Sequence, residues 1–477
     1  MRSLIDLPVS LSRQSAVPLS SQLAGWLREA MLAGTLAPGE RLPSSRGLAA
    51  QLEVSRTVIT EAFQQLYAEG WLEGRHGSGT FVASVETHRP GTAPATPSPA
   101  PAPVEDLAAG AIDLRPGHPW VRDYDRAAWK RAWRKAGDLP PGDHPDPYGL
   151  PRLRELLAGH LRRTRSVAVE PANILVTRGT GNGLDLCALA LLGGGGRAGV
   201  EEPGYHVART VFAARGAEVV PCPVDEDGVI VDGLPDDLGL LYTTPAHQYP
   251  LGGRLPIPRR ERLLAWARST GAMIVEDDYD AEFRYDVAPL PALYGLDPSR
   301  VVLLGTLSKS LAPDVGVGWL VGSPELVARV AALRSGLSDR TSGPVQEAVA
   351  TLLERGDLDR HLRRMRLEYA RRRAVIVETL GPVCRLRGDT AGLHVLAELP
   401  PDPSGGIVER ARELGVLLDP AERHHGSGRP RGLVIGYGSA SLAEVRRGCR
   451  IVAGLIAEAQ SGGAGSRVRR IGSAREA

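Results

Sequence analysis

A segment rich in proline and alanine divides this chain into two parts. Residues 84–108 include the run RPGTAPATPSPAPAPVED, which contains no aromatic residue. Because such a run has too few large apolar side chains to bury a core, it is predicted to be an extended, semi-rigid linker. We therefore expect a small N-terminal domain at residues 1–83 and a large domain at residues 109–462. The Gly/Ser/Arg-rich tail at residues 463–477 is expected to be disordered.

The bulk composition is that of a globular protein in the cytoplasm. The 477 residues exceed one ordinary domain, the formal net charge is only +2, and hydrophobic residues make up 43% of the chain. No apolar run reaches the length of a membrane span, and the N-terminus lacks the pattern of a signal peptide. The cysteines lie far apart without metal-ligand spacing. We therefore expect a cytoplasmic protein with no metal and no membrane partner.

The small domain has the pattern of a winged helix-turn-helix. Apolar residues repeat at helical spacing in residues 19–33, a second helix is predicted to begin near Ser44, and a third follows Ser55, a preferred N-cap residue. Two short strands at residues 71–73 and 80–82 then flank a glycine-bearing turn. Three helices followed by a hairpin are typical of this DNA-binding fold.

The exposed side of the third predicted helix suits contact with DNA. Ser55, Arg56 and Thr57 lie at its start, and Thr60 follows one turn later. Small hydroxyl groups and one arginine there fit phosphate and base-edge contacts in a major groove. Residues 1–83 hold seven arginines and seven acidic residues, so affinity must come from focused contacts and dimerisation. A winged helix that binds protein is the alternative.

The small domain also resembles the GntR-type winged helix almost end to end. The matching stretch is LAGTLAPGERLPSSRGLAAQLEVSRTVITEAFQQLYAEGWLEGRHGSGTFVA. The resemblance implies a double-stranded DNA operator as partner, contacted by the arginine after the LPSS turn, the start of the third helix and the wing. By position, these residues are Arg46, Ser55, Arg56, Thr57, Thr60, His76 and Gly77.

In the large domain, one lysine has an unusual setting. Lys309 is one of only three lysines among 57 basic residues, and it follows the apolar run Val301–Leu304 among small hydroxyl residues. Lysine, unlike arginine, can lose its proton and attack a carbonyl carbon. A Schiff base with pyridoxal phosphate fits this setting, with Thr306 and Ser308 offering hydroxyls to the phosphate. The alternative is an ordinary exposed lysine in a loop.

Three further segments are compatible with the same chemistry. Ile174–Thr177 is predicted to be a strand, and a glycine-bearing turn follows it and opens a helix. The free N–H groups at such a helix start attract anions, although turns of this kind are also common without a ligand. Met273–Val275 is a predicted strand that ends in the acidic run Glu276–Asp280, where open α/β sheets bind ligands; a metal site or a solvated acidic turn are the alternatives. Tyr205 is either an aromatic cover for a flat cofactor or an ordinary core tyrosine.

The order of these segments resembles that of fold-type-I pyridoxal-phosphate-dependent aminotransferases. The resemblance covers residues 109–460 and is sharpest at HPDPYGLPRLRELLAGHLRRTR, YTTPAHQYPLGG, EDDYDAEFRYD and GTLSKSLAP. Together with the winged helix, it makes the whole chain similar to the MocR-type subgroup of GntR-family transcriptional regulators. It implies a large α/β aminotransferase-like domain, a homodimer and a small-molecule effector.

The resemblance also assigns roles to single residues. It implies that Lys309 forms the aldimine with pyridoxal phosphate. Asp277 would pair with the pyridine nitrogen and Tyr279 with the ring oxygen, while Tyr205 would stack near the ring. The remaining pocket residues would be Gly179, Thr180, Gly181, Thr306, Ser308, His247 and Gln248.

Two arginines that are usual in this family are absent. The chain has Gly316 where the family has an arginine for the phosphate or ligand, and Val434 where it has one for an amino-acid carboxylate. Because the carboxylate would lose a charge-assisted pair, we predict that the effector is pyridoxal phosphate itself or a bulkier amine rather than a simple amino acid. The candidate substitutes for the second arginine are Arg209, Arg429 and Arg431.

Three functions follow from these patterns. The favoured one is a DNA-binding regulator whose aminotransferase-like domain senses a small molecule. A working aminotransferase with a vestigial winged helix is disfavoured by Val434, since transamination needs a firmly held carboxylate. A cofactor-free dimerisation scaffold is disfavoured because Lys309, Asp277 and Tyr279 are all present.

Overall fold

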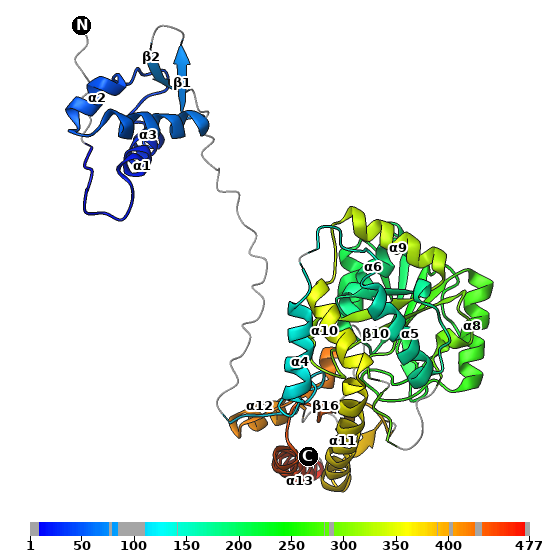
Figure 1. Ribbon diagram of the computed structural model, residues 1–477. Coiled ribbons are helices and arrows are strands. Elements are labelled where there is room, and N and C mark those ends of the chain that lie inside the picture. The colour runs from blue at the N-terminus through cyan, green and yellow to red at the C-terminus, as the bar shows by residue number, and fades with distance from the viewer. Residues whose placement is uncertain are drawn as a thin grey trace. The chain divides into compact units, whose positions relative to one another are not determined.

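Two compact units make up the chain, Met1–Glu105 and Asp106–Ala477, and they are described separately (Figure 1). The computed structural model describes residues 9–75, 79–83, 110–140, 142–280, 282–285, 291–388, 390–399, 404–424 and 432–472. The predicted linker, the wing residues His76 and Gly77, and two candidate substitute arginines, Arg429 and Arg431, lie outside these ranges.

The small unit consists of three helices and a hairpin, as the sequence predicted. Its two strands pair in antiparallel register, with Leu72 opposite Val82. Its elements are α1 (Leu19–Leu32), α2 (Ser45–Gln51), α3 (Arg56–Ala68), β1 (Leu72–Arg75) and β2 (Gly79–Val82).

Local sequence signals set the ends and the buried face of these helices. The Ser44 side chain accepts a hydrogen bond from the backbone N–H of Gly47, and that of Ser55 accepts one from Val58. Each bond satisfies a backbone donor that the first helical turn leaves without a partner. The predicted N-cap at Ser55 is therefore confirmed, and the buried residues of α3 are Ile59, Ala62, Phe63 and Leu66.

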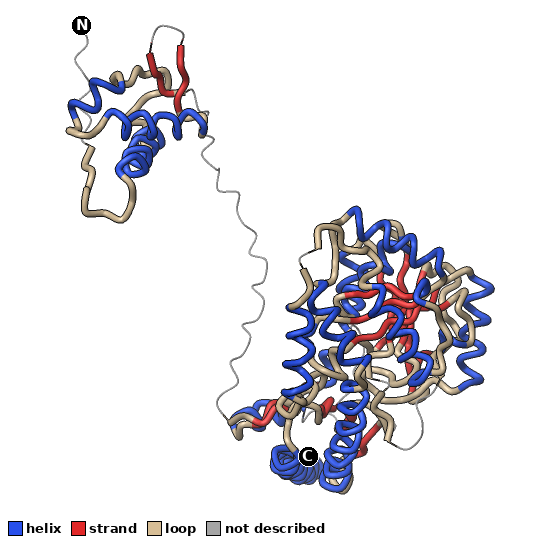
Figure 2. The backbone as a smooth tube through the Cα atoms, viewed as in Figure 1, coloured by secondary structure: helices blue, strands red, loops and turns tan. Residues whose placement is uncertain are grey.

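A mixed eight-stranded sheet forms the centre of the large unit (Figure 2). Its strand order is β4-β11-β10-β9-β8-β5-β6-β7. β11 is antiparallel to both of its neighbours, and β7 is antiparallel to β6, while the other pairs are parallel. The strands are β4 (Ile174–Thr177), β5 (Arg197–Glu202), β6 (Glu218–Asp225), β7 (Gly228–Val229), β8 (Leu240–Thr243), β9 (Met273–Asp277), β10 (Val301–Thr306) and β11 (Gly318–Val321).

Helices cover both faces of this sheet, which explains why strand β10 carries apolar residues on both of its faces. In β10, Val301 and Leu303 join the core on one face, whereas Val302 and Leu304 join the core on the other. The first face is covered by α5 (Pro151–Arg165), α8 (Ile257–Thr270), α10 (Gly343–Glu354) and α11 (Asp357–Leu380), and the second by α6 (Thr180–Leu192), α7 (His206–Ala214) and α9 (Pro324–Gly336).

A smaller antiparallel sheet completes the large unit. Its order is β12 (Arg385–Arg387), β13 (His394–Glu398), β16 (Gly432–Gly436) and β15 (Asp419–Pro420), and β14 (Val416–Leu417) pairs separately with β3 (Ile112–Asp113). The remaining helices are α4 (Arg126–Gly137), α12 (Ser404–Glu413) and α13 (Leu442–Gly472), and short 3₁₀ turns occur at Pro171–Asn173, Leu293–Gly295, Pro313–Val315 and Ala421–His424.

The end of α13 differs from the sequence expectation. The helix continues to Gly472, into the tail at 463–477 for which disorder was predicted. Extending an existing helix adds one hydrogen bond per residue without a new nucleation cost, which composition alone does not reveal. Within the described part of the chain, no helix combines the length and the apolar character needed to cross a membrane.

Candidate cofactor site

The carboxyl ends of the parallel strands open into a cavity of about 350 Å³. β9 and β10 are neighbours with Asp277 opposite Leu304, so the acidic end of one strand and the loop that carries Lys309 meet at the same edge of the sheet. Most residues predicted to hold the cofactor line this cavity: Gly179, Thr180, Gly181, Tyr205, Asp277, Tyr279, Thr306, Ser308 and Lys309.

The amine of Lys309 is buried and close to a backbone carbonyl. Its Nζ donates a hydrogen bond to the oxygen of Gly117 at 2.6 Å. Gly117 has a φ of +94°, a backbone conformation that favours glycine. Burial lowers the pKa of Lys309, and the carboxylates of Asp280 and Asp277 oppose this shift. A lowered pKa leaves more of the amine neutral and nucleophilic near pH 7.

Asp277 presents an unused oxygen to the cavity. Its Oδ2 accepts a hydrogen bond from the Tyr242 hydroxyl at 2.8 Å, whereas its buried Oδ1 has no hydrogen-bond partner among the residues that the structure describes. Burial raises the pKa of Asp277 to about 7, although the Tyr242 hydrogen bond acts in the opposite direction. A buried carboxylate oxygen without a donor is costly, so this site favours a ligand with a cationic N–H group.

The turn between β4 and α6 forms a cradle for an anion. Gly179 has a φ of 96°, and a Cβ there would lie 3.6 Å from Thr306 Oγ1. Thr306 Oγ1 donates to Ser308 Oγ at 2.9 Å, and the buried Thr180 Oγ1 has no partner in the described part of the chain. Free N–H groups at the start of α6 and these hydroxyls suit a phosphate. With Lys309 and Asp277, the cradle fits pyridoxal phosphate.

Aromatic rings form one wall of the cavity. The rings of Tyr205 and Tyr249 meet edge to face, with centroids 6.2 Å apart. Burial raises the pKa of Tyr205 to about 12, so its hydroxyl stays neutral. Flat, apolar faces with few charges suit a planar ring.

Two predicted pocket residues, His247 and Gln248, are placed differently from what the sequence suggested. Their neighbour Tyr279 lines the cavity, and its hydroxyl donates to the backbone oxygen of His247 at 3.1 Å. His247 and Gln248 do not line the cavity, although both had been assigned to the pocket. His247 Nδ1 lies 2.9 Å from Asp280 Oδ2, and Gln248 Nε2 donates to Glu201 Oε2 at 3.2 Å. Both side chains turn away because these buried carboxylates need partners.

Several lining residues were missed by sequence reasoning. Gly117 and His118 come from the segment before α4, and His394 comes from β13. Tyr242 is the next-to-last residue of the buried strand β8, which lies beside the acidic strand β9, so its position near the carboxyl end of a parallel strand was a usable signal. The fold also brings ligand atoms of His247, Asp280 and His394 within 4.8 Å of one another.

The two positions without the usual arginines have different surroundings. Gly316 follows the 3₁₀ turn at Pro313–Val315 with a φ of 58°, and a Cβ built there would lie 3.9 Å from the backbone oxygen of Asp314. Val434 is fully buried in β16, in an apolar cluster with Leu396, Ala421 and Leu251. Of the candidate substitutes, Arg209 pairs with Glu202.

Behind the cavity, a buried ion pair supports the acidic loop after β9. Arg165 Nε donates to Asp278 Oδ2 at 2.6 Å and Arg165 Nη2 to Oδ1 at 2.8 Å, and both side chains are under 10% exposed. Burial raises the pKa of Asp278, and the guanidinium of Arg165 opposes that shift. The pair fixes the chain between Asp277 and Tyr279.

In the small unit, the predicted DNA-contacting residues within the described ranges are exposed. Arg56 Nε donates to Ser45 Oγ at 3.3 Å, and Thr60 Oγ1 donates to the backbone oxygen of Arg56 at 2.9 Å. Ser55 uses its hydroxyl oxygen to cap α3. The exposed set is Arg46, Ser55, Arg56, Thr57 and Thr60.

A winged helix joined to an aminotransferase fold defines a class of transcriptional regulator, and comparison with known proteins identifies the family. Residues 19–82 match the bacterial regulatory proteins of the gntR family, and residues 126–405 match aminotransferase class I and II. The chain therefore belongs to the GntR-family helix-turn-helix regulators of MocR type, which carry an aminotransferase-like domain.

Individual relatives agree with this assignment. The chain is 38% identical to the HTH-type pyridoxine biosynthesis transcriptional regulator PdxR of Corynebacterium glutamicum, over 91% of this chain and 95% of that protein. It is 33% identical to the probable rhizopine catabolism regulatory protein MocR of Rhizobium meliloti, over 95% and 97%. Among solved structures, it resembles the α-aminoadipate aminotransferase LysN of Thermus thermophilus, with a TM-score of 0.67, 26% identity and coverage of 74% and 94%.

Proposed function

We propose that this regulator binds pyridoxal phosphate at Lys309 and that occupancy of the cavity changes its affinity for operator DNA. The observation that carries the proposal is the convergence of a buried amine, an unused oxygen of Asp277 and an anion cradle in one cavity. When bound, pyridoxal phosphate supplies an aldehyde that attaches reversibly to amines.

Each residue has one task in this proposal. Lys309 supplies the amine, and its lowered pKa keeps that amine reactive. Asp277 keeps the pyridine nitrogen protonated by accepting its N–H at Oδ1. This N–H gives Oδ1 the hydrogen-bond donor that it otherwise lacks among the described residues. The hydroxyls of Thr180, Thr306 and Ser308 bind the phosphate.

The proposed signal is the cofactor itself rather than an amino acid. Among the described residues, Val434 and its apolar neighbours offer no cation to a carboxylate at that position, and a carboxylate buried without a charged partner is unfavourable. The 38% identical relative is named as a regulator of pyridoxine biosynthesis, which supports the same signal here. A bulkier amine that exchanges with Lys309 is the second ligand compatible with this cavity.

Operator binding tests this function directly. DNA selected from a random pool by the full chain would be labelled, and its Kd measured by fluorescence anisotropy with and without pyridoxal phosphate. We expect the Kd to change by at least about fivefold, the lower end of ordinary allosteric coupling. Common amino acids should leave it unchanged. Equal affinity at every cofactor concentration would contradict the proposal, and a shift produced by one amino acid alone would contradict the choice of signal.

The small unit acts on DNA as one of two copies in a homodimer in this proposal. Residues 1–83 have no net charge, so one copy gains little from general attraction to phosphates. A dimer presents two α3 helices to the DNA, so it makes twice as many specific contacts as a single copy. The stoichiometry of the anisotropy titration reports this directly.

Replacing Arg56 by alanine should weaken operator binding by about tenfold or more. Its guanidinium lies at the exposed start of α3, where a base-edge or phosphate contact has this weight. If the contact is to phosphate, the slope of log Kd against log salt should also fall by about one. Arg28→Ala is the matched control, because Arg28 pairs with Glu69 within the unit. Equal losses in both variants would count against a DNA contact by Arg56.

A further inference from the structure

Arg178 lies at the same end of the same strand pair as the missing family arginine. β11 runs antiparallel to β4, with Gly318 opposite Thr177. Arg178 directly follows Thr177, and Gly316 precedes Gly318 by two residues. Close packing joins these segments, because a Cβ at Gly318 would lie 2.8 Å from the Cα of Gly179. The guanidinium of Arg178 can therefore reach the part of the cavity that an arginine at position 316 would reach in other family members.

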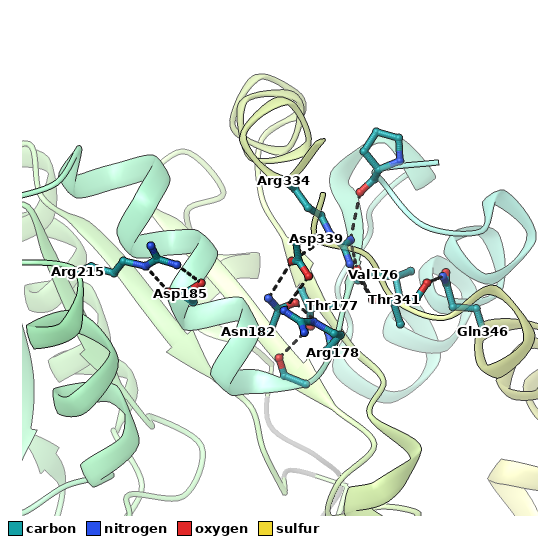
Figure 3. A network of polar contacts seen from close by, with 12 residues as sticks. Val176, Thr177, Arg178, Asn182, Asp185, Arg215, Arg334, Asp339, Thr341 and Gln346 are labelled. Atoms are coloured by element: carbon teal, nitrogen blue, oxygen red, sulfur yellow. Dashed lines mark hydrogen bonds and ion pairs between the residues drawn. The ribbon is translucent and has the colours of Figure 1, made fainter. Parts of the chain in front are cut away.

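A network of polar contacts holds Arg178 in place (Figure 3). Arg178 Nη2 pairs with Asp339 Oδ1 at 2.7 Å, and Asn182 Nδ2 donates to Asp339 Oδ2 at 3.1 Å. Asn182 Oδ1 in turn accepts the backbone N–H of Arg178 at 3.0 Å. Figure 3 shows that these side chains converge on the Asp339 carboxylate beside the start of α6.

The same carboxylate also faces a second arginine. Arg334 Nε lies 3.4 Å from Asp339 Oδ2, and Arg334 is buried, with further bonds to the oxygen of Pro147 and to Thr341 Oγ1. Two guanidinium groups therefore share one carboxylate, which leaves one positive charge beside the anion cradle. Arg334 is buried, whereas the side chain of Arg178 is about half exposed, so the remaining N–H groups of Arg178 are the ones that can reach an anion while Asp339 holds this side chain.

We propose that Arg178, positioned by Asp339, supplies the guanidinium that binds the phosphate of the cofactor in place of the arginine absent at position 316. This inference rests on the proposed binding of pyridoxal phosphate. Among the described residues that line the cavity, Arg178 is the only arginine. A guanidinium binds a phosphate through two parallel N–H groups, which hydroxyls and backbone amides alone do not reproduce.

The test compares two ligands that differ only in the phosphate. Pyridoxal phosphate and pyridoxal would be titrated into the full-length protein and into Arg178→Gln, and binding followed by visible absorbance. We expect the variant to lose about tenfold to hundredfold in affinity for pyridoxal phosphate, the weight of a charge-assisted pair. Its affinity for pyridoxal should stay within about twofold. Inorganic phosphate should compete with the cofactor less well in the variant than in the wild type.

Arg215→Gln is the matched control. Arg215 makes an ion pair with Asp185 on α6 through two hydrogen bonds of 2.6 and 2.8 Å, and Figure 3 shows this pair away from the Asp339 network. The variant Arg215→Gln should bind pyridoxal phosphate and pyridoxal with the affinities of the wild type. Arg178→Lys keeps the charge without the paired N–H groups, so it should show a smaller loss that is again confined to the phosphorylated ligand.

The outcomes separate this inference from the proposed function. If the wild type binds neither ligand, the proposed function fails. If the wild type binds pyridoxal phosphate and Arg178→Gln binds it equally well, only the role of Arg178 is wrong. Equal losses for both ligands in Arg178→Gln and Arg178→Lys would show that Arg178 supports the loop rather than the phosphate, and would also overturn the inference.

Discussion

Replacing Lys309 by alanine will abolish the visible absorbance that pyridoxal phosphate gains when it attaches to this protein. The attachment needs a neutral amine next to the aldehyde, and Lys309 is the only lysine lining the cavity among the described residues. An alanine offers no nucleophile, so the loss should be complete rather than partial. Absorption spectra of both proteins, before and after borohydride, measure it. In the wild type, borohydride should fix the cofactor to the peptide that contains Lys309.

The control for this experiment is Lys130→Ala. Lys130 is exposed on α4, so this variant should give the spectrum of the wild type. Because burial lowers the pKa of Lys309, the wild type should also take up the cofactor at a lower pH than an exposed lysine would allow. An equally strong band in Lys309→Ala would contradict the assignment of the amine.

Replacing Arg165 by methionine should destabilise the large unit by about 3–5 kcal/mol, the usual cost of breaking a buried ion pair. The substitution removes the bidentate partner of Asp278 and leaves that carboxylate buried near Glu276 and Glu282. Repulsion among these groups then adds to the cost of burial. Denaturant unfolding followed by intrinsic fluorescence reports the free energy of unfolding.

The Arg215–Asp185 pair provides the contrast. Both of its side chains are about one-third exposed, so Arg215→Met should cost less than about 1 kcal/mol. If Arg165→Met also costs less than about 1 kcal/mol, the buried pair does not stabilise the loop after β9 in the way its geometry indicates. Arg165→Met should also weaken cofactor binding, because Asp278 lies between the cavity residues Asp277 and Tyr279 in the chain.

The fold and part of the site could be predicted because their signals are local. The composition of the linker indicated that the chain has two units. Serine residues indicated where helices begin, and apolar runs followed by acidic residues or lysine indicated the carboxyl ends of strands. Parallel strands bring such ends to one edge, so Asp277 and Lys309 could be expected to meet before any coordinates were known.

Other parts of the site had no such signal. Gly117 and His394 reach the cavity from segments far away in sequence, and only tertiary packing brings them there. His247 and Gln248 stand in a motif shared with the family, but a motif does not tell which way a side chain points, and here buried carboxylates draw both away. Arg178 lies within the glycine-bearing turn, where the glycines, and not the arginine, carry the sequence signal for an anion site.

The hydrogen bond between Lys309 and Gly117 places the cofactor site in competition with the chain itself. Gly117 follows the interdomain linker by only a few residues, and its carbonyl oxygen holds the Nζ of Lys309. A ligand that bonds to this nitrogen leaves it fewer N–H groups, so the ligand and the carbonyl compete for the same nitrogen. The stretch of chain that leads away from the DNA-binding unit thus serves as an internal stand-in for the ligand.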